Sequence, residues 1–388
     1  MTDAQERDVK NLSGGELQRL AIIAAMVREA DVYLFDEPTS YLDISQRLKA
    51  AATIRELARE KSVIIVEHDL AVLDYLSDYT HIFYGKPAVY GVVSAPYSVR
   101  VGINTYLSGF IREENMRFRD TSITFSETTK SWRVDDLLLH YPSLAKRYPA
   151  FELKVEGGML YRGEVVGVVG PNATGKSTFV QILAGAQESE QGFMSDLRIS
   201  YKPQYLQKDI DANVEAYMLD KVGKEMYASV YKTEVLGSLE LEPLFPNNVS
   251  ELSGGELQRL NIAICISQEA DIYLLDEPSA YLDVEQRLAC SRLIRRKMEA
   301  QKTTALVVEH DIVSVDYLSD RLIVFEGIPS IRGHATAPTL LKEGMNKFLK
   351  NQDITFRREP ETGRPRANKR DSQLDREQKE RGEYYYKD

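Results

Sequence analysis

The chain has 388 residues, of which 43% are apolar and 28% charged, and its formal net charge at pH 7 is −10. This length is enough for two or three domains with buried cores, and the composition is that of a globular rather than a disordered chain. The acidic balance excludes a protein that binds nucleic acid over its whole surface, but it permits a local basic face.

The chain shows no sign of a membrane or secretory segment. Apolar runs such as 21–27 are far shorter than the ~20 residues of a membrane helix. The polar N-terminus lacks the apolar core of a signal peptide, so the cytoplasm is the expected location. Cys265 and Cys290 have no CxxC or Cys/His spacing around them, so we expect two buried thiols and no zinc or iron–sulfur site.

One long stretch of sequence occurs twice. Residues 12–48 begin with LSGGELQRL and contain DEPTSYLD, and residues 252–288 begin with the same nine letters and contain DEPSAYLD. The match resumes in residues 63–78 and 305–320, which share VEHD and DYLSD. A repeat of this length predicts two homologous domains in tandem rather than a solenoid.

In each copy an apolar run ends in an aspartate and a glutamate, and a second apolar run ends at a histidine. These residues are Asp36, Glu37 and His68 in the first copy and Asp276, Glu277 and His310 in the second. Continuous apolar runs between amphipathic stretches predict buried parallel strands of an α/β sheet. Ligand-binding residues then lie at the carboxyl ends of those strands.

A glycine-rich loop precedes the second copy alone. The stretch GEVVGVVGPNATGKST (163–178) predicts a strand, a loop and a helix, and RISYKPQY (198–205) follows it. In the pattern GxxxxGK[ST] the loop amides cradle phosphates, the lysine reaches the β and γ oxygens, and the hydroxyl binds Mg²⁺. The predicted ATP-binding residues are Gly170, Asn172, Gly175, Lys176, Ser177 and Thr178.

The acids and the histidine of the second copy have predicted roles in hydrolysis. Asp276 is expected to be an outer ligand of Mg²⁺, together with Ser177 and Gln204. Glu277 is the candidate that polarises the attacking water, because this role needs a carboxylate that the metal does not consume. His310 and Gln204 are expected to contact the γ-phosphate and its water.

LSGGE places a serine and two glycines directly before an amphipathic helix. The start of such a helix offers free amides and a positive dipole end to an anion. The residues are Ser13, Gly14, Gly15 and Glu16 in the first copy and Ser253, Gly254 and Gly255 in the second.

Together, the phosphate loop, Gln204, LSGGE, the acid pair and the EHD histidine resemble the ABC-type ATPases. The doubled LSGGELQR, the segment YGVVSAPYSVRVGIN…FIREENMRFR and the C-terminal NQDITFRREPETGRPRANKRDSQLDREQKE resemble subfamily E, the archaeal and eukaryotic ribosome-recycling or RNase L inhibitor family. The resemblance runs from Val9 to the end of the chain. It implies an α/β fold of the P-loop NTPase type with tandem nucleotide-binding domains, of which the first is incomplete.

The resemblance implies four segments. Residues 1–88 are the C-terminal part of the first nucleotide-binding domain, 89–134 a hinge, 135–335 the complete second domain, and 336–388 a C-terminal hinge and basic tail. A tail of this arginine-rich, polar composition is usually solvated and loosely ordered. Its arginines would suit phosphate if it lay across a partner.

The chain departs from the family pattern in two ways. Family members begin with a cysteine-rich domain that carries two [4Fe–4S] clusters, followed by a complete first cassette. This sequence contains neither the cluster cysteines nor the first phosphate loop, so iron–sulfur clusters are not expected. The family also has glycine where this chain has Ala173, and at a positive φ alanine costs about 1 kcal/mol.

We therefore expect the C-terminal part of a longer factor, from a split gene, an alternative start or an incomplete gene model. A separate chain is one candidate source of the missing half. Residues 1–88 would then form a partial sheet with an unpaired edge and uncovered apolar surface, unstable alone.

In the family each ATP is held between the phosphate loop of one cassette and the signature of the other. The resemblance thus implies that the second-domain residues face Ser13, Gly14 and Gly15. The opposite site would bring Asp36, Glu37 and His68 to Ser253, Gly254 and Gly255 without a phosphate loop, so it is a degenerate site that does not bind ATP tightly.

The implied function is Mg²⁺-dependent ATP hydrolysis that drives ribosome recycling, with the small ribosomal subunit (rRNA and protein) and translation termination factors as partners and no membrane. The alternatives are an ATP-binding fragment without splitting activity and a transporter ATPase subunit. A DNA-repair ATPase of the cassette type needs a long coiled coil before the signature, for which residues 179–251 leave no room.

Overall fold

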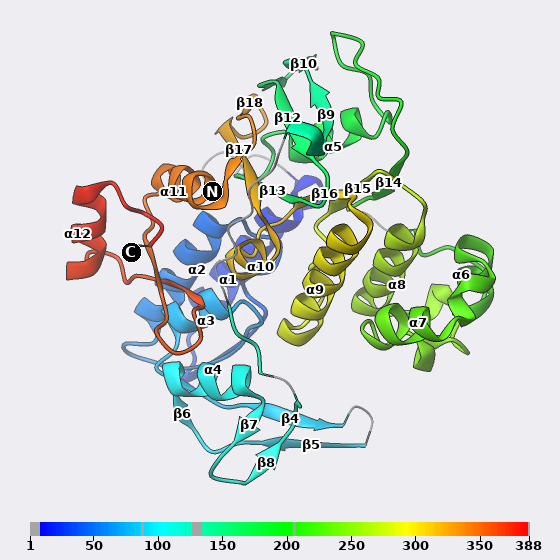
Figure 1. Ribbon diagram of the computed structural model, residues 1–388. Helices are drawn as coiled ribbons and strands as arrows, with labels where there is room; N and C mark the ends of the chain where they lie inside the picture. The colour runs from blue at the N-terminus through cyan, green and yellow to red at the C-terminus, as the bar shows by residue number, and fades with distance from the viewer. Residues whose placement is uncertain (1–7, 87–88, 121, 126–133, 205–206, 387–388) are drawn as a thin grey trace. The chain divides into compact units, whose positions relative to one another are not determined.

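The computed structural model describes residues 8–86, 89–120, 122–125, 134–204 and 207–386 (Figure 1). The chain divides into two compact units, one of residues 1–127 with 352–388 and one of residues 128–351. These units group the chain differently from the four segments expected from the sequence, because the C-terminal residues belong with the first copy of the repeat. Among the described residues, no helix combines the length and the apolar character needed to cross a membrane.

The larger unit is built on a mixed sheet with the strand order β10-β11-β18-β17-β13-β16-β15-β14, and β19 pairs with β17. The strands from β17 to β14 in this order are parallel neighbours. A separate antiparallel pair joins β9 to β12. The strands are β9 Leu137–Tyr141, β10 Leu144–Arg147, β11 Glu152–Val155, β12 Gly158–Tyr161, β13 Val165–Val169, β14 Ile199–Lys202, β15 Ile272–Asp276, β16 Thr304–Val308, β17 Arg321–Ile328, β18 Arg332–Ala335 and β19 Thr339–Leu340.

The helices of this unit cover both faces of the parallel strands. They are α5 Lys176–Leu183, α6 Val214–Val222, α7 Ser229–Tyr231, α8 Gly254–Ser267, α9 Val284–Gln301, α10 Ile312–Leu318 and α11 Leu341–Gln352. Short 3₁₀ helices lie at Lys224–Tyr227, Glu242–Leu244 and Val249–Glu251, and a π-helix lies at Lys232–Gly237.

Every residue of β13, β15 and β16 is buried. One core contains Leu274 and Leu306 together with Phe179 of α5, and the other contains Tyr273 together with Leu260 of α8. Strands covered on both faces need apolar side chains at every position. The predicted buried parallel sheet is confirmed for the second copy.

Side-chain caps set the helix starts in both copies of the repeat. Ser253 and Glu256 form a capping box at α8, Asp283 caps α9, and Asp311 caps α10. The first copy has the same caps at α1 Gly14–Val27, α2 Ile44–Leu57 and α3 Leu70–Leu76, supplied by Ser13 with Glu16, Asp43 and Asp69. Each cap satisfies amides that the first helical turn leaves without a partner.

In the smaller unit, β1 Val32–Asp36 pairs in parallel with β2 Ser62–Val66, and among the described residues no further strand joins them. Tyr33 and Phe35 pack into a core with Ile54 of α2 and Val72 of α3. The alternate side chains of both strands are exposed. The prediction of fully buried strands is therefore wrong for the first copy, and the expectation of uncovered apolar surface is confirmed.

After α3, the described part of the smaller unit continues with three short antiparallel strand pairs and one helix. β3 Tyr79–Thr80 pairs with β6 Tyr97–Ser98, β4 Phe83–Lys86 with β5 Tyr90–Val93, and β7 Phe110–Ile111 with β8 Met116–Arg117. Helix α4 Val99–Ser108 lies between β6 and β7 in the chain and ends at Gly109, whose φ of 72° is left-handed.

The C-terminal tail is ordered, and the expectation of a loosely ordered tail is wrong. It contains β20 Phe356–Arg358 paired with β21 Pro365–Ala367, and α12 Gln373–Arg381. Arg364 is completely buried, and its Nη2 lies 3.3 Å from Oδ2 of Asp74 in α3. Arg366 Nε lies 2.5 Å from the same oxygen. Composition suggested solvated arginines, but these arginines are held by ion pairs within the unit.

Candidate functional site

The phosphate loop joins β13 to α5 in the larger unit. Gly170 and Gly175 have φ values of 152° and 96°, and a Cβ on Gly170 would lie 2.5 Å from the carbonyl oxygen of Phe325. Lys176 donates hydrogen bonds to the carbonyls of Gly170 at 3.0 Å and Pro171 at 2.7 Å, so its ammonium group lies over the loop. Helix-start amides beside a lysine form a site suited to phosphate. Ala173 has a φ of 59°, the left-handed conformation in which alanine is unfavourable.

Asp276 lies at the carboxyl end of β15 and is buried. Burial raises its pKa to about 6, with a further rise from Glu277, while Ser177, Lys202 and Lys176 lower it. Neither carboxylate oxygen has a partner within normal hydrogen-bond geometry among the described residues. A buried carboxylate in this condition is costly unless a cation or donor meets it.

The groups around Asp276 therefore fit magnesium. Mg²⁺ is typically held by one or two carboxylates, together with phosphate oxygens and water. Asp276 supplies a carboxylate, and Ser177 supplies a hydroxyl close enough to affect the pKa of Asp276. Over the described part of the chain, no group of three His, Cys, Asp or Glu residues forms an all-protein metal cage.

Glu277, Gln204 and His310 meet beside Asp276. Oε1 of Glu277 accepts a hydrogen bond from Nε2 of Gln204 at 2.8 Å and lies 3.2 Å from Nε2 of His310. Burial alone would raise the pKa of Glu277, but His310, Gln204 and Lys176 together bring it down to about 2. The side chain is therefore ionised at neutral pH and can accept a hydrogen bond from water but not donate one.

The structure brings the predicted residues of the second copy to one edge of the sheet. Lys176 and Ser177 follow β13, Gln204 follows β14, Asp276 and Glu277 close β15, and His310 follows β16. These strands are adjacent in the sheet order, so their carboxyl ends meet. Asn172 and Thr178 belong to the same phosphate loop and helix α5.

Sequence reasoning missed several polar residues in this region. Glu309 accepts a 2.6 Å hydrogen bond from the Ser279 hydroxyl, and Gln258 donates to the carbonyl of Glu277 at 2.6 Å. Lys202 donates to the carbonyl of Asp276 at 2.8 Å, and burial lowers its pKa to about 8. A signal for Glu309 and Gln258 was present, because both belong to the repeated text as Glu67 and Gln18.

The first copy repeats part of this geometry within the smaller unit. Glu37 Oε1 lies 3.4 Å from Nε2 of His68, and Gln18 donates to the carbonyl of Glu37 at 3.1 Å. Glu37 and Glu277 both have a left-handed backbone, with φ values of 43° and 48°. Asp36, however, is exposed, whereas Asp276 is buried.

The signature serines begin α1 and α8 in the same way. Ser13 and Ser253 are exposed, and each accepts a hydrogen bond from the amide of the glutamate three residues later. A Cβ on Gly15 would lie 2.9 Å from the carbonyl oxygen of Tyr41, and one on Gly255 would lie 2.8 Å from that of Tyr281. The second glycine is therefore required for the close approach of the backbone. Gly14 and Gly254 are the first residues of the two helices.

A parallel sheet with a phosphate loop, a signature helix and a strand that ends in an aspartate–glutamate pair defines the ABC-type ATPase domain. The family model described as ABC transporter matches residues 1–40 and 157–280.

Relatives match this chain over nearly its whole length. An uncharacterized ABC transporter ATP-binding protein of Methanocaldococcus jannaschii is 54% identical over 99% of this chain and 64% of its own length. The translation initiation factor RLI1 of Saccharomyces cerevisiae is 49% identical over 99% of this chain and 64% of its own length. A solved structure described as RNase-L Inhibitor is 54% identical, with a TM-score of 0.94, and the match covers 99% of this chain and 75% of that one.

The archaeal ribosome recycling factor aABCE1, solved in complex with the archaeal ribosomal stalk protein aP1, is 53% identical with a TM-score of 0.93, and the match covers 99% of this chain and 76% of that one. The chain belongs to the RNase L inhibitor family of ABC-type ATPases, subfamily E, as its hinge and tail motifs predict. It spans 64% of the length of the curated relatives from M. jannaschii and S. cerevisiae.

Proposed function

We propose that this chain binds and hydrolyses MgATP at the carboxyl edge of the larger unit's sheet and that it acts in ribosome recycling. The contact of Glu277 with Gln204 and His310 is the observation that carries the ATPase proposal. The recycling part is supported by relatives, among them the recycling factor solved with a ribosomal stalk protein and a structure described as ribosome-bound archaeal Pelota and ABCE1, which is 54% identical to this chain.

The residues divide the chemistry among them. The loop amides and Lys176 bind the phosphates, and Ser177, Asp276 and Gln204 are the residues that would hold Mg²⁺. When bound, the ion supplies charge neutralisation to the phosphates. Ionised Glu277 accepts a hydrogen bond from the attacking water, and His310 and Gln204 orient that water toward the γ-phosphate.

We further propose that the signature of the first copy completes this site. Ser13, Gly14, Gly15 and Glu16 start α1, where the positive end of the helix dipole favours the triphosphate. By the same head-to-tail rule, Asp36, Glu37 and His68 pair with Ser253, Gly254 and Gly255 in a second site. We propose that this second site is degenerate, because Asp36 is exposed where its counterpart Asp276 is buried.

The small ribosomal subunit is the proposed partner of residues 89–134, together with translation termination factors, in the cytoplasm. This segment combines arginines with aromatic rings, and the exposed Arg117 lies over Phe110 at 5.2 Å from the ring centroid. Arginines beside aromatic side chains suit RNA phosphates and unstacked bases.

A pelleting assay tests the proposal. The full chain is mixed with small ribosomal subunits and either a non-hydrolysable ATP analogue or ADP, and turnover is measured with ATP. We expect the analogue to increase the pelleted fraction and Lys176→Ala to abolish the increase. Analogue binding without any turnover, with or without subunits, would instead support an ATP-binding module without hydrolysis, which the strained Ala173 in the loop favours.

A further inference from the structure

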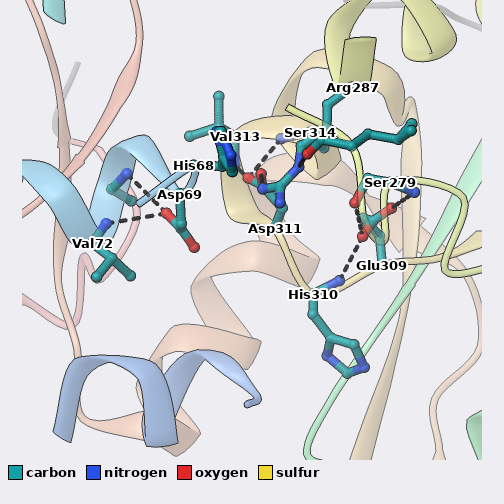
Figure 2. Close-up of polar contacts among 12 residues, drawn as sticks. His68, Asp69, Val72, Ser279, Arg287, Glu309, His310, Asp311, Val313 and Ser314 are labelled. Atoms are coloured by element: carbon teal, nitrogen blue, oxygen red, sulfur yellow. Dashed lines mark hydrogen bonds and ion pairs between the residues drawn. The ribbon is translucent and has the colours of Figure 1, made fainter. Parts of the chain in front are cut away.

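Glu309 is a buried carboxylate that lies between two segments of the candidate site (Figure 2). Its Oε1 accepts hydrogen bonds from the Ser279 hydroxyl at 2.6 Å and from the His310 amide at 3.1 Å, and its Oε2 lies 3.4 Å from the Ser279 amide. Its own amide donates to the carbonyl of Val168 in β13 at 3.2 Å. One side chain thus joins the segment after β15 to the segment after β16.

Both joined segments carry a member of the candidate catalytic pair. Ser279 follows Glu277 by two residues, and His310 follows Glu309 directly. The imidazole ring of His310 projects away from Glu309 (Figure 2), and its Nε2 lies 3.2 Å from Glu277 Oε1. Glu309 therefore holds the backbone of His310 and the segment just after Glu277, and its hydrogen bonds go to neither the imidazole nor the Glu277 carboxylate.

The same arrangement occurs in the other unit, where the first copy folds in different surroundings. Glu67 accepts a 2.6 Å hydrogen bond from the Thr39 hydroxyl and hydrogen bonds from the amides of His68 at 2.9 Å and Asp69 at 3.0 Å. Threonine thus takes the place of serine with the same hydrogen-bond length. The contact depends on the hydroxyl and the glutamate, not on the rest of the side chain.

The burial of this glutamate contributes little to the stability of the fold. A buried carboxylate costs free energy unless donors satisfy it, and apolar residues of similar volume often stabilise as well or better. Burial accordingly raises the pKa of Glu309, as it does that of Glu67. Glu277, two residues before Ser279, has a left-handed backbone, which adds a further cost in conformational free energy. Such costs are typical of sites where geometry matters more than stability.

We propose that Glu309 is a positioning residue for ATP hydrolysis, which fixes the distance between Glu277 and His310 by clamping Ser279 to the backbone of the histidine. This inference rests on the proposed ATPase activity. Because the side chain of Glu309 is bonded to Ser279 and to the His310 amide rather than to the phosphate loop, its loss lowers the rate of hydrolysis and leaves the binding of MgATP nearly unchanged.

The test uses the full chain and measures kcat for ATP, Kd for MgATP and the thermal midpoint of unfolding. Glu309→Ala is expected to lower kcat by about 10- to 100-fold with Kd changed less than about twofold, since small misplacements of catalytic groups cost this much. Glu309→Gln keeps an oxygen for Ser279 and His310, so its kcat lies above that of Glu309→Ala.

Variants of Ser279 test the same contact without changing the buried glutamate. Ser279→Ala removes the hydroxyl and lowers kcat, whereas Ser279→Thr, which copies Thr39, keeps the wild-type rate. The double variant Glu309→Ala with Ser279→Ala is no slower than Glu309→Ala alone, because both remove one contact. Glu67→Ala removes the matched contact from the other unit and serves as the control, with kcat changed less than about twofold.

Any of three results overturns the inference. The first is a wild-type kcat in folded Glu309→Ala, and the second is an equal loss of kcat and of MgATP binding in Glu309→Ala together with a lower thermal midpoint. The third is an equal loss of kcat in Ser279→Thr and Ser279→Ala. Failure of the proposed function looks different. In that case the unchanged chain neither binds nor hydrolyses MgATP, and Lys176→Ala makes no difference.

Discussion

The paired strands of the two copies have similar apolar sequences but different burial. Leu34 in β1 is 73% exposed, whereas its counterpart Leu274 in β15 is completely buried. Ile64 in β2 is 60% exposed, and Leu306 at the matching position of β16 is completely buried. The difference lies in the neighbours, because α5 packs on the second pair and β13 extends its sheet, whereas no described element of the smaller unit takes their place.

The polar geometry, in contrast, is nearly the same in the two copies. The hydroxyl-to-glutamate bond is 2.6 Å in both, and the histidine-to-glutamate distance is 3.4 Å in the first and 3.2 Å in the second. Short segments that follow adjacent parallel strands thus determine where the catalytic side chains point. The layers around the sheet determine whether those side chains are buried and whether a phosphate loop lies beside them.

Leucine truncation in matching strands tests the difference in burial. Leu274→Ala is expected to lower the free energy of unfolding of the larger unit by about 2–5 kcal/mol, because it leaves a cavity in a fully packed core. Leu34→Ala is expected to change the stability of the smaller unit by less than about 0.5 kcal/mol. Urea unfolding followed by circular dichroism, with hydrogen exchange to assign the units, measures both. Similar losses in the two variants would mean that the outer face of β1 and β2 is covered in solution.

The sequence predicted the site better than its surroundings. The phosphate loop and the acid pair directly follow apolar runs, and the histidine follows one after a single glutamate, so their meeting at one sheet edge follows from parallel pairing. Glu309 and Gln258 were missed because their partners Ser279 and Glu277 are distant in the chain. The burial of Arg364 against Asp74 was missed for the same reason, since composition carries no information about a contact 290 residues apart.

Amide substitution of the two glutamates tests the difference in function. Glu277→Gln is expected to lower kcat by about 100-fold or more and to leave ATP bound, because the amide fits the site but does not activate water. Glu37→Gln is expected to change kcat less than about threefold, since the neighbouring Asp36 is exposed where Asp276 is buried. Steady-state hydrolysis and retention of labelled ATP on the protein measure the two effects. Unchanged hydrolysis in Glu277→Gln would show that another group is the catalytic carboxylate, and comparable losses in both variants would show that both copies contribute.

The buried glutamate of the second copy gives its unit a pH-dependent stability. Burial, then Asp311 and Glu277, raise the pKa of Glu309 from 4.5 to about 7, although the Ser279 hydroxyl and the His310 amide lower it. Below about pH 4.5 the group is protonated in the folded and unfolded chains alike. As the pH rises toward about 7 the unfolded chain loses this proton first, so the free energy of unfolding falls, and above about 7 this contribution is constant.

Urea unfolding at about pH 5 and about pH 8 measures this contribution. In Glu309→Gln, which does not ionise, the fall in stability between the two pH values is expected to be smaller by about 2 kcal/mol. The matched variant Glu67→Gln should alter the pH dependence of the smaller unit and leave that of the larger unit as it is. An unchanged slope for the larger unit in Glu309→Gln would mean that Glu309 titrates in its ordinary range.

The smallest expected effect concerns the phosphate loop between β13 and α5 of the larger unit. Ala173 adopts a φ of 59°, where its Cβ approaches the following carbonyl oxygen. Ala173→Gly removes that strain but adds freedom to the unfolded chain, so the net gain is about 0.5–1 kcal/mol, or a few degrees in the thermal midpoint of the larger unit. The loop amides hold the phosphates, so a larger population of the binding conformation of the loop should also tighten MgATP binding. Calorimetry is expected to show a decrease in Kd of a few-fold at most. A lower thermal midpoint in Ala173→Gly would show that the methyl group contributes packing worth more than the backbone strain it imposes.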